Sequence, residues 1–283
     1  MPDQNSLISV AELARCIDED KLRIIDCRFD LLAPSAGRRA YLEAHIPGAV
    51  YADLDHDLSA PVGMTTGRHP LPDIECIAAA FGRMGIDDAT TVVVYDERSG
   101  AVAARAWWML RWLGHSRVAV LDGGLAAWQE AGFALQAGVV AVPNREFIAR
   151  AQHDWIISTD SIAAGLGRGL RLLDARASRR FEGLAEPIDA VAGHIPGAIN
   201  LPFERCLEAD GRFRRPGALR EILASVLGGP GETNLAVMCG SGVTACHLIL
   251  ASKLAGLPEP RLYAGSWSEW IRDPGRPVAT GPA

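Results

Sequence analysis

The sequence has no excess of basic residues and no long hydrophobic run. Its 28 Lys and Arg residues are outnumbered by 34 Asp and Glu residues, which gives a formal net charge of -6 at pH 7. Nucleic-acid-binding domains present a basic surface to the phosphates, so nucleic acid is not an expected partner. No apolar run approaches the ~18 residues of a membrane-spanning helix, so we expect no membrane partner either.

The sequence also lacks a secretory signal and any paired-cysteine motif. Residues 1–10 are acidic and polar where a signal would place a basic segment before an apolar one. Six cysteines in 283 residues are too few for a disulfide scaffold, and none has the Cys-x-x-Cys spacing typical of zinc sites and thioredoxin-like motifs. We predict a protein of the reducing cytoplasm that needs neither a metal nor a cofactor.

What is present is an ordinary globular composition, with 49% hydrophobic and 22% charged residues, and a length that suggests two domains. Apolar runs predict strands at residues 22–27, 91–95 and 118–121. A helical pattern covers residues 101–113 and ends at Gly114, and Ser9 is the expected N-cap of a first helix. Strands that alternate with helices indicate an α/β fold with a mainly parallel sheet.

The second half of the sequence repeats the first. Four blocks return in the same order at offsets of 148, 149, 143 and 142 residues: 24–28 as 172–176, 44–50 as 193–199, 92–96 as 235–239, and 121–128 as 263–270. The period is too long for a solenoid array, so we infer a duplicated domain. We predict one domain over residues 1–140, a linker over residues 141–154 and a second domain over residues 155–283.

One loop in the second half is a candidate reactive site. The sequence Cys239-Gly240-Ser241-Gly242 follows an apolar run, residues 235–238, and precedes a helical pattern, residues 243–255. Such a loop turns backbone N–H groups and a helix dipole towards the sulfur, and both favour a nucleophilic thiolate. Glycine suits the dihedral angles of the tight turn. The alternative is a buried cysteine that only packs.

The corresponding loop of the first half has lost the cysteine. At the position that matches Cys239 it has Asp96, followed by Glu97, Arg98 and Ser99. A ring of backbone N–H groups can hold a carboxylate, but a carboxylate cannot perform thiol chemistry. We therefore predict that only the second half is catalytic and that the first half has a structural and substrate-shaping role.

These features resemble the two-domain sulfurtransferases of the rhodanese superfamily. The resemblance rests on the duplicated His-Ile-Pro-Gly-Ala blocks, Asp174-Ala175-Arg176, the Leu-Asp-Gly-Gly block at 121–124, the Gly-Ser-Trp block at 265–267 and the single cysteine loop. It covers about residues 6–275 and implies two tandem rhodanese-like domains, each a mainly parallel sheet flanked by helices. The loop Cys-Gly-Ser-Gly-Val-Thr-Ala is similar to that of the 3-mercaptopyruvate sulfurtransferases, whereas thiosulfate sulfurtransferases usually have Cys-Arg-Lys-Gly-Val-Thr.

The resemblance implies a two-step sulfur transfer. The Cys239 thiolate takes sulfur from mercaptopyruvate as a persulfide and releases pyruvate, and a thiol, thioredoxin or cyanide then accepts the sulfur. The residues that would bind the substrate and the persulfide along the loop are Gly240, Gly242, Val243 and Thr244. The alternative functions are a thiosulfate:cyanide sulfurtransferase and a sulfur carrier without turnover. A cysteine phosphatase is disfavoured because it would need an arginine where this loop has Ala245.

Three further residues are implied to assist proton transfer, because pyruvate leaves as an enol or enolate. They are Asp55, His69 and Ser241. Each has a simpler interpretation: Asp55 as a surface carboxylate in an acidic loop, His69 as a loop histidine without a role, and Ser241, like Thr244, as a helix N-cap. The repeated His45 and His194 are interpreted as structural, since both halves have them, and His247 as a core residue.

Arg180 is the residue that the resemblance assigns to the donor's carboxylate. Mercaptopyruvate has one carboxylate far from its sulfur, so a neutral Gly-Ser loop with one distant arginine suits it, whereas the thiosulfate dianion benefits from cations beside the sulfur. A solvated surface arginine is the alternative. The sequence departs from the mercaptopyruvate enzymes at Ile188, where they commonly have a second arginine, and at Ala264, where the family has aspartate.

Overall fold

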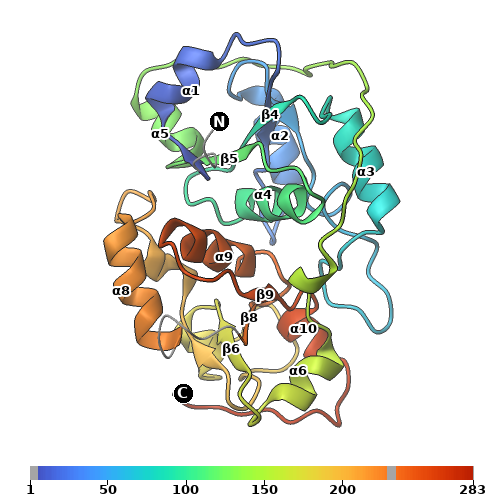
Figure 1. Cartoon of the computed structure of the whole chain (residues 1–283), viewed down its shortest axis with the longest axis vertical. Helices are drawn as coiled ribbons and strands as arrows, with labels where there is room; N and C mark the ends of the chain where they lie inside the picture. Colours follow the sequence, from blue (N-terminus) through green and yellow to red (C-terminus); the bar gives the residue numbers. More distant parts are fainter. Residues whose placement is uncertain (1–5, 228–233, 283) are drawn as a thin grey trace. The chain divides into compact units, whose positions relative to one another are not determined.

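The computed structural model describes residues 6–227 and 234–282 and divides into two compact units (Figure 1). Residues up to 60, 71–152 and 209–213 form the first unit, and residues 61–70, 153–208 and from 214 onward form the second. The division after Gln152 falls inside the expected linker. Each unit also takes a short segment from the other half of the sequence. These segments begin at residues 61 and 209, which are 148 positions apart, one of the offsets of the repeat.

The first unit is built around a five-stranded sheet in which neighbouring strands are parallel. Across the sheet the strands are β1 (Leu7–Ile8), β5 (Val118–Leu121), β4 (Thr91–Tyr95), β2 (Leu22–Asp26) and β3 (Val50–Tyr51). The bounds of β4 and β5 are those predicted, and β2 ends one residue early. The side chains of β4 are buried from Val92 onward, as expected for a parallel strand covered on both faces.

Helices cover both faces of this sheet (Figure 1). One face carries α1 (Val10–Cys16) and α5 (Gly124–Glu130), and the other carries α2 (Ser35–Glu43), α3 (Ile74–Arg83) and α4 (Ala103–Trp112). The N-cap of α1 is Ser9, whose side chain forms a reciprocal capping box with Glu12 as predicted. Helix α4 begins two residues later than predicted, because Gly100 and Val102 lie in a turn that donates N–H groups to Asp96.

The second unit contains a four-stranded parallel sheet. Across it the strands are β7 (Ile199–Asn200), β6 (Arg171–Asp174), β8 (Leu235–Met238) and β9 (Arg261–Leu262). All four residues of β8 are buried, and its bounds are those predicted. Because β8 lies inside the sheet and points its carboxyl end at the loop that starts with Cys239, the sheet places the loop at the edge where parallel sheets commonly bind ligands.

Helices also flank this second sheet (Figure 1). On one side are α6 (Thr159–Gly165) and α10 (Ser266–Trp270), and on the other are α8 (Pro216–Leu227) and α9 (Ala245–Leu254). Helix α7 (Ser178–Phe181) packs with α6 and α10 through Phe181. Short 3₁₀ turns are η1 (His153–Trp155) and η2 (Phe203–Cys206). Trp267 and Trp270 of α10 pack into the core with Phe181 of α7. His247 of α9 is fully buried against Phe203, as predicted for a core histidine.

The repeated histidines have matching structural roles. His45 Nδ1 lies 2.7 Å from the carbonyl oxygen of Tyr41, and its ring stacks on the Tyr41 ring. His194 Nδ1 lies 2.8 Å from the carbonyl oxygen of Phe181, and its ring stacks on the Phe181 ring. Each histidine therefore ties its turn to the preceding helix, which agrees with the structural interpretation.

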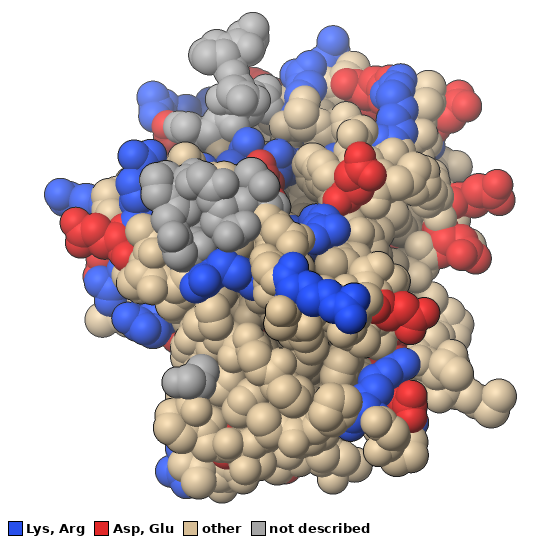
Figure 2. Space-filling view, turned by 60° about the horizontal axis from the view of Figure 1, so that its bottom comes forward, with Lys and Arg blue, Asp and Glu red and all other residues tan. Residues whose placement is uncertain are grey.

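Three features agree with the composition: the helix lengths, the surface charges and the buried tryptophans. Within the described residues, no helix is both long and apolar enough to cross a membrane. On the face shown in Figure 2, basic and acidic side chains are interspersed. Trp107 and Trp108 of α4 are almost fully buried, so the aromatic content of this helix serves packing.

Candidate active site

Cys239 is held at the carboxyl end of β8 by hydrogen bonds from both directions. Its Sγ accepts a hydrogen bond from the backbone N–H of Gly242 at 3.1 Å. Its own N–H donates to Ser266 Oγ at 3.1 Å, and its carbonyl oxygen accepts from the Trp267 N–H at 3.0 Å. The residue is 2% exposed. A backbone donor aimed at the sulfur favours a negative charge on it, which is the feature a nucleophilic thiolate needs.

The two glycines of the loop are required for different reasons. Gly242 has φ +77°, and a Cβ at this position would lie 2.4 Å from the carbonyl oxygen of Ala264, so any other residue would be strained and would clash. A Cβ on Gly240 would lie 3.1 Å from Arg68 Nη2 and 3.5 Å from Arg180 Nη2. Gly240 therefore leaves room for two guanidinium groups beside the reactive loop.

Those two guanidinium groups share one carboxylate. Arg68 Nη1 donates to Asp189 Oδ1 at 2.5 Å, and Arg180 Nη2 donates to Asp189 Oδ2 at 2.9 Å. Arg68 lies in the segment 61–70 and Arg180 in α7, yet both belong to the second unit. Sequence reasoning found Arg180 and missed both Arg68 and Asp189. The available signal was position, since Arg68 directly precedes His69 and Asp189 directly follows Ile188.

Glu186 completes the ion-pair network around Arg180. Both carboxylate oxygens of Glu186 accept from Arg180 Nε at 3.0 Å, and Glu186 Oε2 lies 3.5 Å from Arg176 Nη1. Burial raises the pKa of Glu186, but the hydrogen bonds from Arg180 and from backbone N–H groups outweigh it, so its pKa lies below the ordinary value. Arg180 is consequently a fixed side chain, 17% exposed, and not the solvated arginine of the alternative interpretation.

His69 and Ser241 form a buried pair in this unit. His69 Nδ1 lies 2.7 Å from Ser241 Oγ, and the two residues are 4% and 6% exposed. The segment that carries His69 is fixed by the Arg68 N–H, which donates to Ser268 Oγ at 3.0 Å, and by Arg272 Nε, which donates to the Thr66 carbonyl oxygen. The structure thus brings together two of the three residues assigned to proton transfer.

The third, Asp55, belongs to the first unit, so the site built from second-unit residues does not include it. Its backbone N–H donates to Asp53 Oδ1 at 2.9 Å. Burial and the neighbouring Asp53 raise the pKa of Asp55 above its ordinary value. Its participation in the reaction stays a prediction.

The remaining loop residues line the start of α9. Val243 is 6% exposed, and Thr244 is half-buried at the N-cap position. Thr244 is the N-cap residue of α9, as the alternative interpretation expected, but among the described residues its hydroxyl makes no capping hydrogen bond. Its backbone is helical, which does not place the hydroxyl towards the N–H groups as an extended N-cap does.

Ser266 supports the backbone of Cys239, and sequence reasoning missed it. It has φ +54°, and among the described residues it is the one non-glycine with a positive φ. Its Oγ accepts from the Cys239 N–H and donates to the Tyr263 carbonyl oxygen at 2.9 Å. The matching residue in the first unit is Gly124, also at positive φ. In the sequence, the signal was that the repeat aligns a serine with a glycine. A serine that adopts a backbone conformation typical of glycine points to a role for its hydroxyl.

Comparison with known proteins agrees with this geometry. A model of the rhodanese-like domain matches the chain twice, over residues 9–131 and 158–273. The chain belongs to the rhodanese-like family. The two matched segments are the two copies inferred from the internal repeat, and both predicted rhodanese-like domains are confirmed.

Individual family members match nearly end to end. A Pseudomonas aeruginosa protein named "Probable 3-mercaptopyruvate sulfurtransferase" is 51% identical over 278 residues, which are 97% of this chain and 98% of the relative. A Mycobacterium tuberculosis protein provisionally named a thiosulfate sulfurtransferase is 43% identical over 98% of each chain. The crystal structure of the Escherichia coli 3-mercaptopyruvate sulfurtransferase covers 94% of this chain and 100% of its own, with a TM-score of 0.82 and 32% identity.

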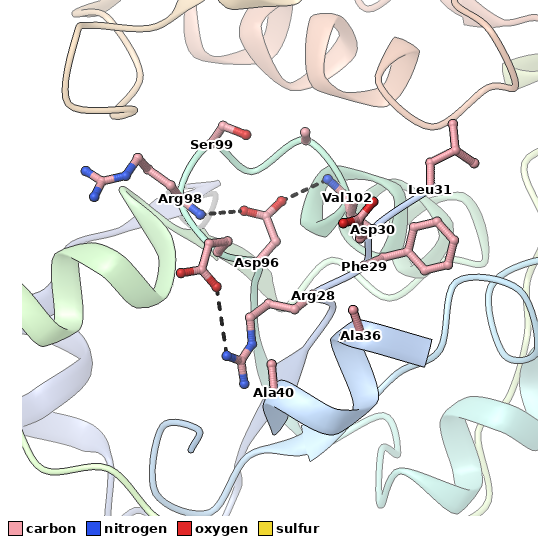
Figure 3. Close-up of a pocket in the computed structure, with 13 residues that line it drawn as sticks. Arg28, Phe29, Asp30, Leu31, Ala36, Ala40, Asp96, Arg98, Ser99 and Val102 are labelled. Atoms are coloured by element: carbon pink, nitrogen blue, oxygen red, sulfur yellow. Dashed lines mark hydrogen bonds and ion pairs between the residues drawn. The ribbon is translucent and has the colours of Figure 1, made fainter. Parts of the chain in front are cut away.

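The first rhodanese-like domain has a loop that corresponds to the cysteine loop of the second. We call the ring of backbone N–H groups in each loop its cradle, and in the first domain a carboxylate fills it. Asp96, at the position of Cys239, accepts backbone hydrogen bonds from Arg98, Gly100, Val102 and Ala103 at 2.8–3.2 Å. Figure 3 shows those from Arg98 and Val102. Burial raises the pKa of Asp96 above its ordinary value, although these four donors lower it. The prediction that this loop holds a carboxylate in a ring of N–H groups is confirmed.

A cavity of about 490 Å³ opens beside Asp96, with Arg28, Phe29, Leu31 and Val102 among its walls (Figure 3). Arg28 forms an ion pair with Asp26, and its Nη1 lies 3.8 Å from Glu97 Oε2. None of the described residues that line the cavity is a cysteine, and the carboxylate of Asp96 already accepts the backbone N–H groups of its loop. Within the described residues, no three His, Cys, Asp or Glu side chains are grouped to hold a metal ion.

We expect Asp96→Asn to destabilise the first domain by about 1–3 kcal/mol, because the amide nitrogen would face backbone donors that the carboxylate now satisfies. Sulfur transfer by the folded protein should not change, since the reactive cysteine is in the other domain. Thermal unfolding checks the first statement, and turnover at 25 °C checks the second. Glu97→Gln is the matched control: its side chain is 68% exposed, so its effect should stay within about 0.5 kcal/mol. Equal stability of both variants would contradict the structural role of Asp96.

Proposed function

We propose that the protein is a sulfurtransferase that moves sulfur from 3-mercaptopyruvate to a thiophilic acceptor through a persulfide on Cys239. The observation that carries the proposal is the placement of Cys239 Sγ against the Gly242 N–H, in a loop beside Arg68 and Arg180. The first of these features stabilises a sulfur anion, and the second attracts an anionic donor. The names of the P. aeruginosa and E. coli relatives support the same donor.

The transfer step follows from the chemistry of the donor. The Cys239 thiolate attacks the sulfur of mercaptopyruvate, an S–S bond forms, and the C–S bond breaks with its electron pair passing to carbon. The organic product is the enolate of pyruvate, which takes up one proton, while the persulfide releases the proton that the donor's thiol carried. No oxidant or reductant is consumed, and the protons balance.

His69 and Ser241 are suited to move that proton. A buried imidazole and hydroxyl at 2.7 Å can pass a proton between them without an exposed charge. The pair lies in the reactive loop itself, because Ser241 is two residues after Cys239. We assign the pair to the protonation of the departing enolate, with Asp55 as the further residue that the family resemblance implies.

The Asp96 loop supports the persulfide as the intermediate. A persulfide extends two atoms beyond Cβ, as a carboxylate does, and it carries its negative charge on the outer atom. Asp96 Oδ2 accepts hydrogen bonds from the N–H groups of Val102 and Ala103. The repeat offset of 143 assigns their counterparts in the second domain to Ala245 and Cys246. The Cys246 N–H already donates to the Val243 carbonyl oxygen at 3.0 Å. We therefore place the outer sulfur at the N–H groups of Ala245 and of Gly240 to Thr244.

Thiosulfate is the second candidate donor. The specific observation in its favour is Arg68, a second guanidinium beside Gly240 that the loop sequence did not predict. The M. tuberculosis relative carries a thiosulfate name. For the acceptor we propose a thiol, with thioredoxin as the protein candidate and cyanide as the laboratory substitute. The six cysteines are free thiols, which suits the reducing cytoplasm that we propose as the site of the reaction.

The experiment is a sulfur-transfer assay with each donor. The purified protein is incubated with cyanide and either 3-mercaptopyruvate or thiosulfate, and thiocyanate and pyruvate are measured. We expect thiocyanate from both tubes, equimolar pyruvate from the first, and a higher kcat/KM for mercaptopyruvate. A higher kcat/KM for thiosulfate would replace the proposed donor with the second candidate. If neither donor yields thiocyanate, the proposed sulfurtransferase activity is refuted.

A further inference from the structure

Asp189 holds an unusual position between the two arginines of the site. One of its oxygens accepts from Arg68 and the other from Arg180, and its side chain is only 3% exposed. Each arginine still has a nitrogen beside the loop, because a Cβ on Gly240 would lie 3.1 Å from Arg68 Nη2 and 3.6 Å from Arg180 Nη1. Asp189 thus fixes both guanidinium groups while it neutralises part of their charge.

The charge count extends through the whole network. Arg180 also pairs with Glu186, Glu186 lies 3.5 Å from Arg176, and Arg176 pairs with Asp174 at 2.7 Å. With Arg68 and Asp189, the network contains three guanidinium groups and three carboxylates, so its formal charge is zero. All three carboxylates are at most 3% exposed, and charges this well buried are screened little by solvent.

We infer that Asp189 is a specificity-determining residue that tunes the site to a donor with a single negative charge. Thiosulfate is a dianion and mercaptopyruvate at pH 7 is a monoanion, so each added unit of positive charge beside the loop favours thiosulfate more. This inference rests on the proposed sulfur transfer, but it names a residue and a property that the transfer itself does not require. Asp189 acts through Arg68 and Arg180 and does not need to touch the donor.

The test is the ratio of kcat/KM for thiosulfate to kcat/KM for mercaptopyruvate, measured at pH 7 with cyanide as acceptor. Asp189→Asn removes one negative charge and keeps the shape of the side chain, so we expect this ratio to rise about tenfold. Arg68→Gln removes one positive charge from the same cluster, so we expect the ratio to fall. A residue that only supports the structure would change both donors in parallel and would leave the ratio unchanged.

Two further variants separate charge from shape. Asp189→Glu keeps the charge, so the ratio should stay near the wild-type value even where both rates fall. Asp160→Asn makes the same charge change at an exposed position of α6 in the same unit and should change neither donor. Thermal unfolding of each variant verifies that the rates come from folded protein. If Asp189→Asn does not fold, the opposite shift in Arg68→Gln decides the matter.

The result is independent of which donor the wild-type protein prefers. A wild-type preference for thiosulfate would overturn the proposed donor, but a rise of the ratio in Asp189→Asn would still support the inference. A wild-type preference for mercaptopyruvate with an unchanged ratio in both charge variants would overturn the inference and leave the proposed function intact. A ratio that moves the same way in Asp189→Asn and Arg68→Gln would also overturn it.

Discussion

Replacing Cys239 with serine should abolish sulfur transfer and leave the fold intact. A serine hydroxyl is far less acidic than a thiol, so the Gly242 N–H and the loop cannot hold it as an anion at neutral pH. An oxygen at this position also cannot form the S–S bond of a persulfide. We expect kcat to fall by at least about 1,000-fold. The change removes one buried sulfur and keeps a hydrogen-bonding group, so the unfolding temperature should change little.

The measurement is thiocyanate formation from mercaptopyruvate and cyanide, together with mass spectrometry of the protein after the donor alone. In the wild-type protein, the mass of the peptide that contains Cys239 should increase by about 32 Da, the mass of one sulfur atom, as expected for a covalent intermediate. Cys76→Ser is the matched control, because Cys76 is exposed in α3 of the other domain. Turnover near the wild-type level in Cys239→Ser would move the nucleophile to another residue.

The repeat explains why so much of the fold could be predicted from one sequence. The bounds of β4, β5 and β8 follow from short apolar runs between polar residues, and a parallel strand buried on both faces gives that pattern directly. The comparison of Asp96 with Cys239 then distinguished a loop that holds a carboxylate from a loop that holds a reactive cysteine. Two copies of one domain provide an internal control that a single-domain sequence does not have.

The composition of the arginine cluster could not be predicted in the same way. Arg68 and Asp189 are 121 residues apart, and apart from their neighbours His69 and Ile188 no local pattern marks either one. They meet because the segment 61–70 belongs to the second unit, an exchange that depends on tertiary packing. Ile188 stands where the resemblance led us to expect a second arginine, and the sequence has no periodicity that would point to an arginine from the other half of the chain.

The amino ends of two helices, α4 and α9, were predicted less well than the strands, and for one reason. Both α4 and α9 begin two residues after the apolar pattern does. In α4, these first residues belong to the turn that donates N–H groups to Asp96, and α9 follows the matching turn after Cys239. Ala101, Val102 and Thr244 are half-buried and Val243 is buried. The apolar pattern therefore continues through residues that belong to the turn and not to the helix.

The second large effect is expected at Arg180. Lysine in its place keeps the charge but loses the planar guanidinium group, which pairs with Glu186 and Asp189 through Nε and Nη2 and leaves Nη1 for a donor carboxylate. We expect Arg180→Lys to raise the KM for mercaptopyruvate about 10- to 100-fold, which corresponds to the loss of one charge-assisted hydrogen bond. The KM for cyanide should stay within about twofold, since cyanide reacts with the persulfide after pyruvate has left.

Lysine is the informative substitution because alanine would change stability as well. Arg180→Ala would leave Glu186 with Arg176 and Asp189 with Arg68, so each buried carboxylate would lose one of two cationic partners. Arg179→Lys, on the exposed neighbour in α7, is the matched control and should leave both constants unchanged. Steady-state kinetics with each substrate varied in turn distinguish the cases. Equal increases in the two Michaelis constants would mean that Arg180 supports the loop and does not bind the carboxylate.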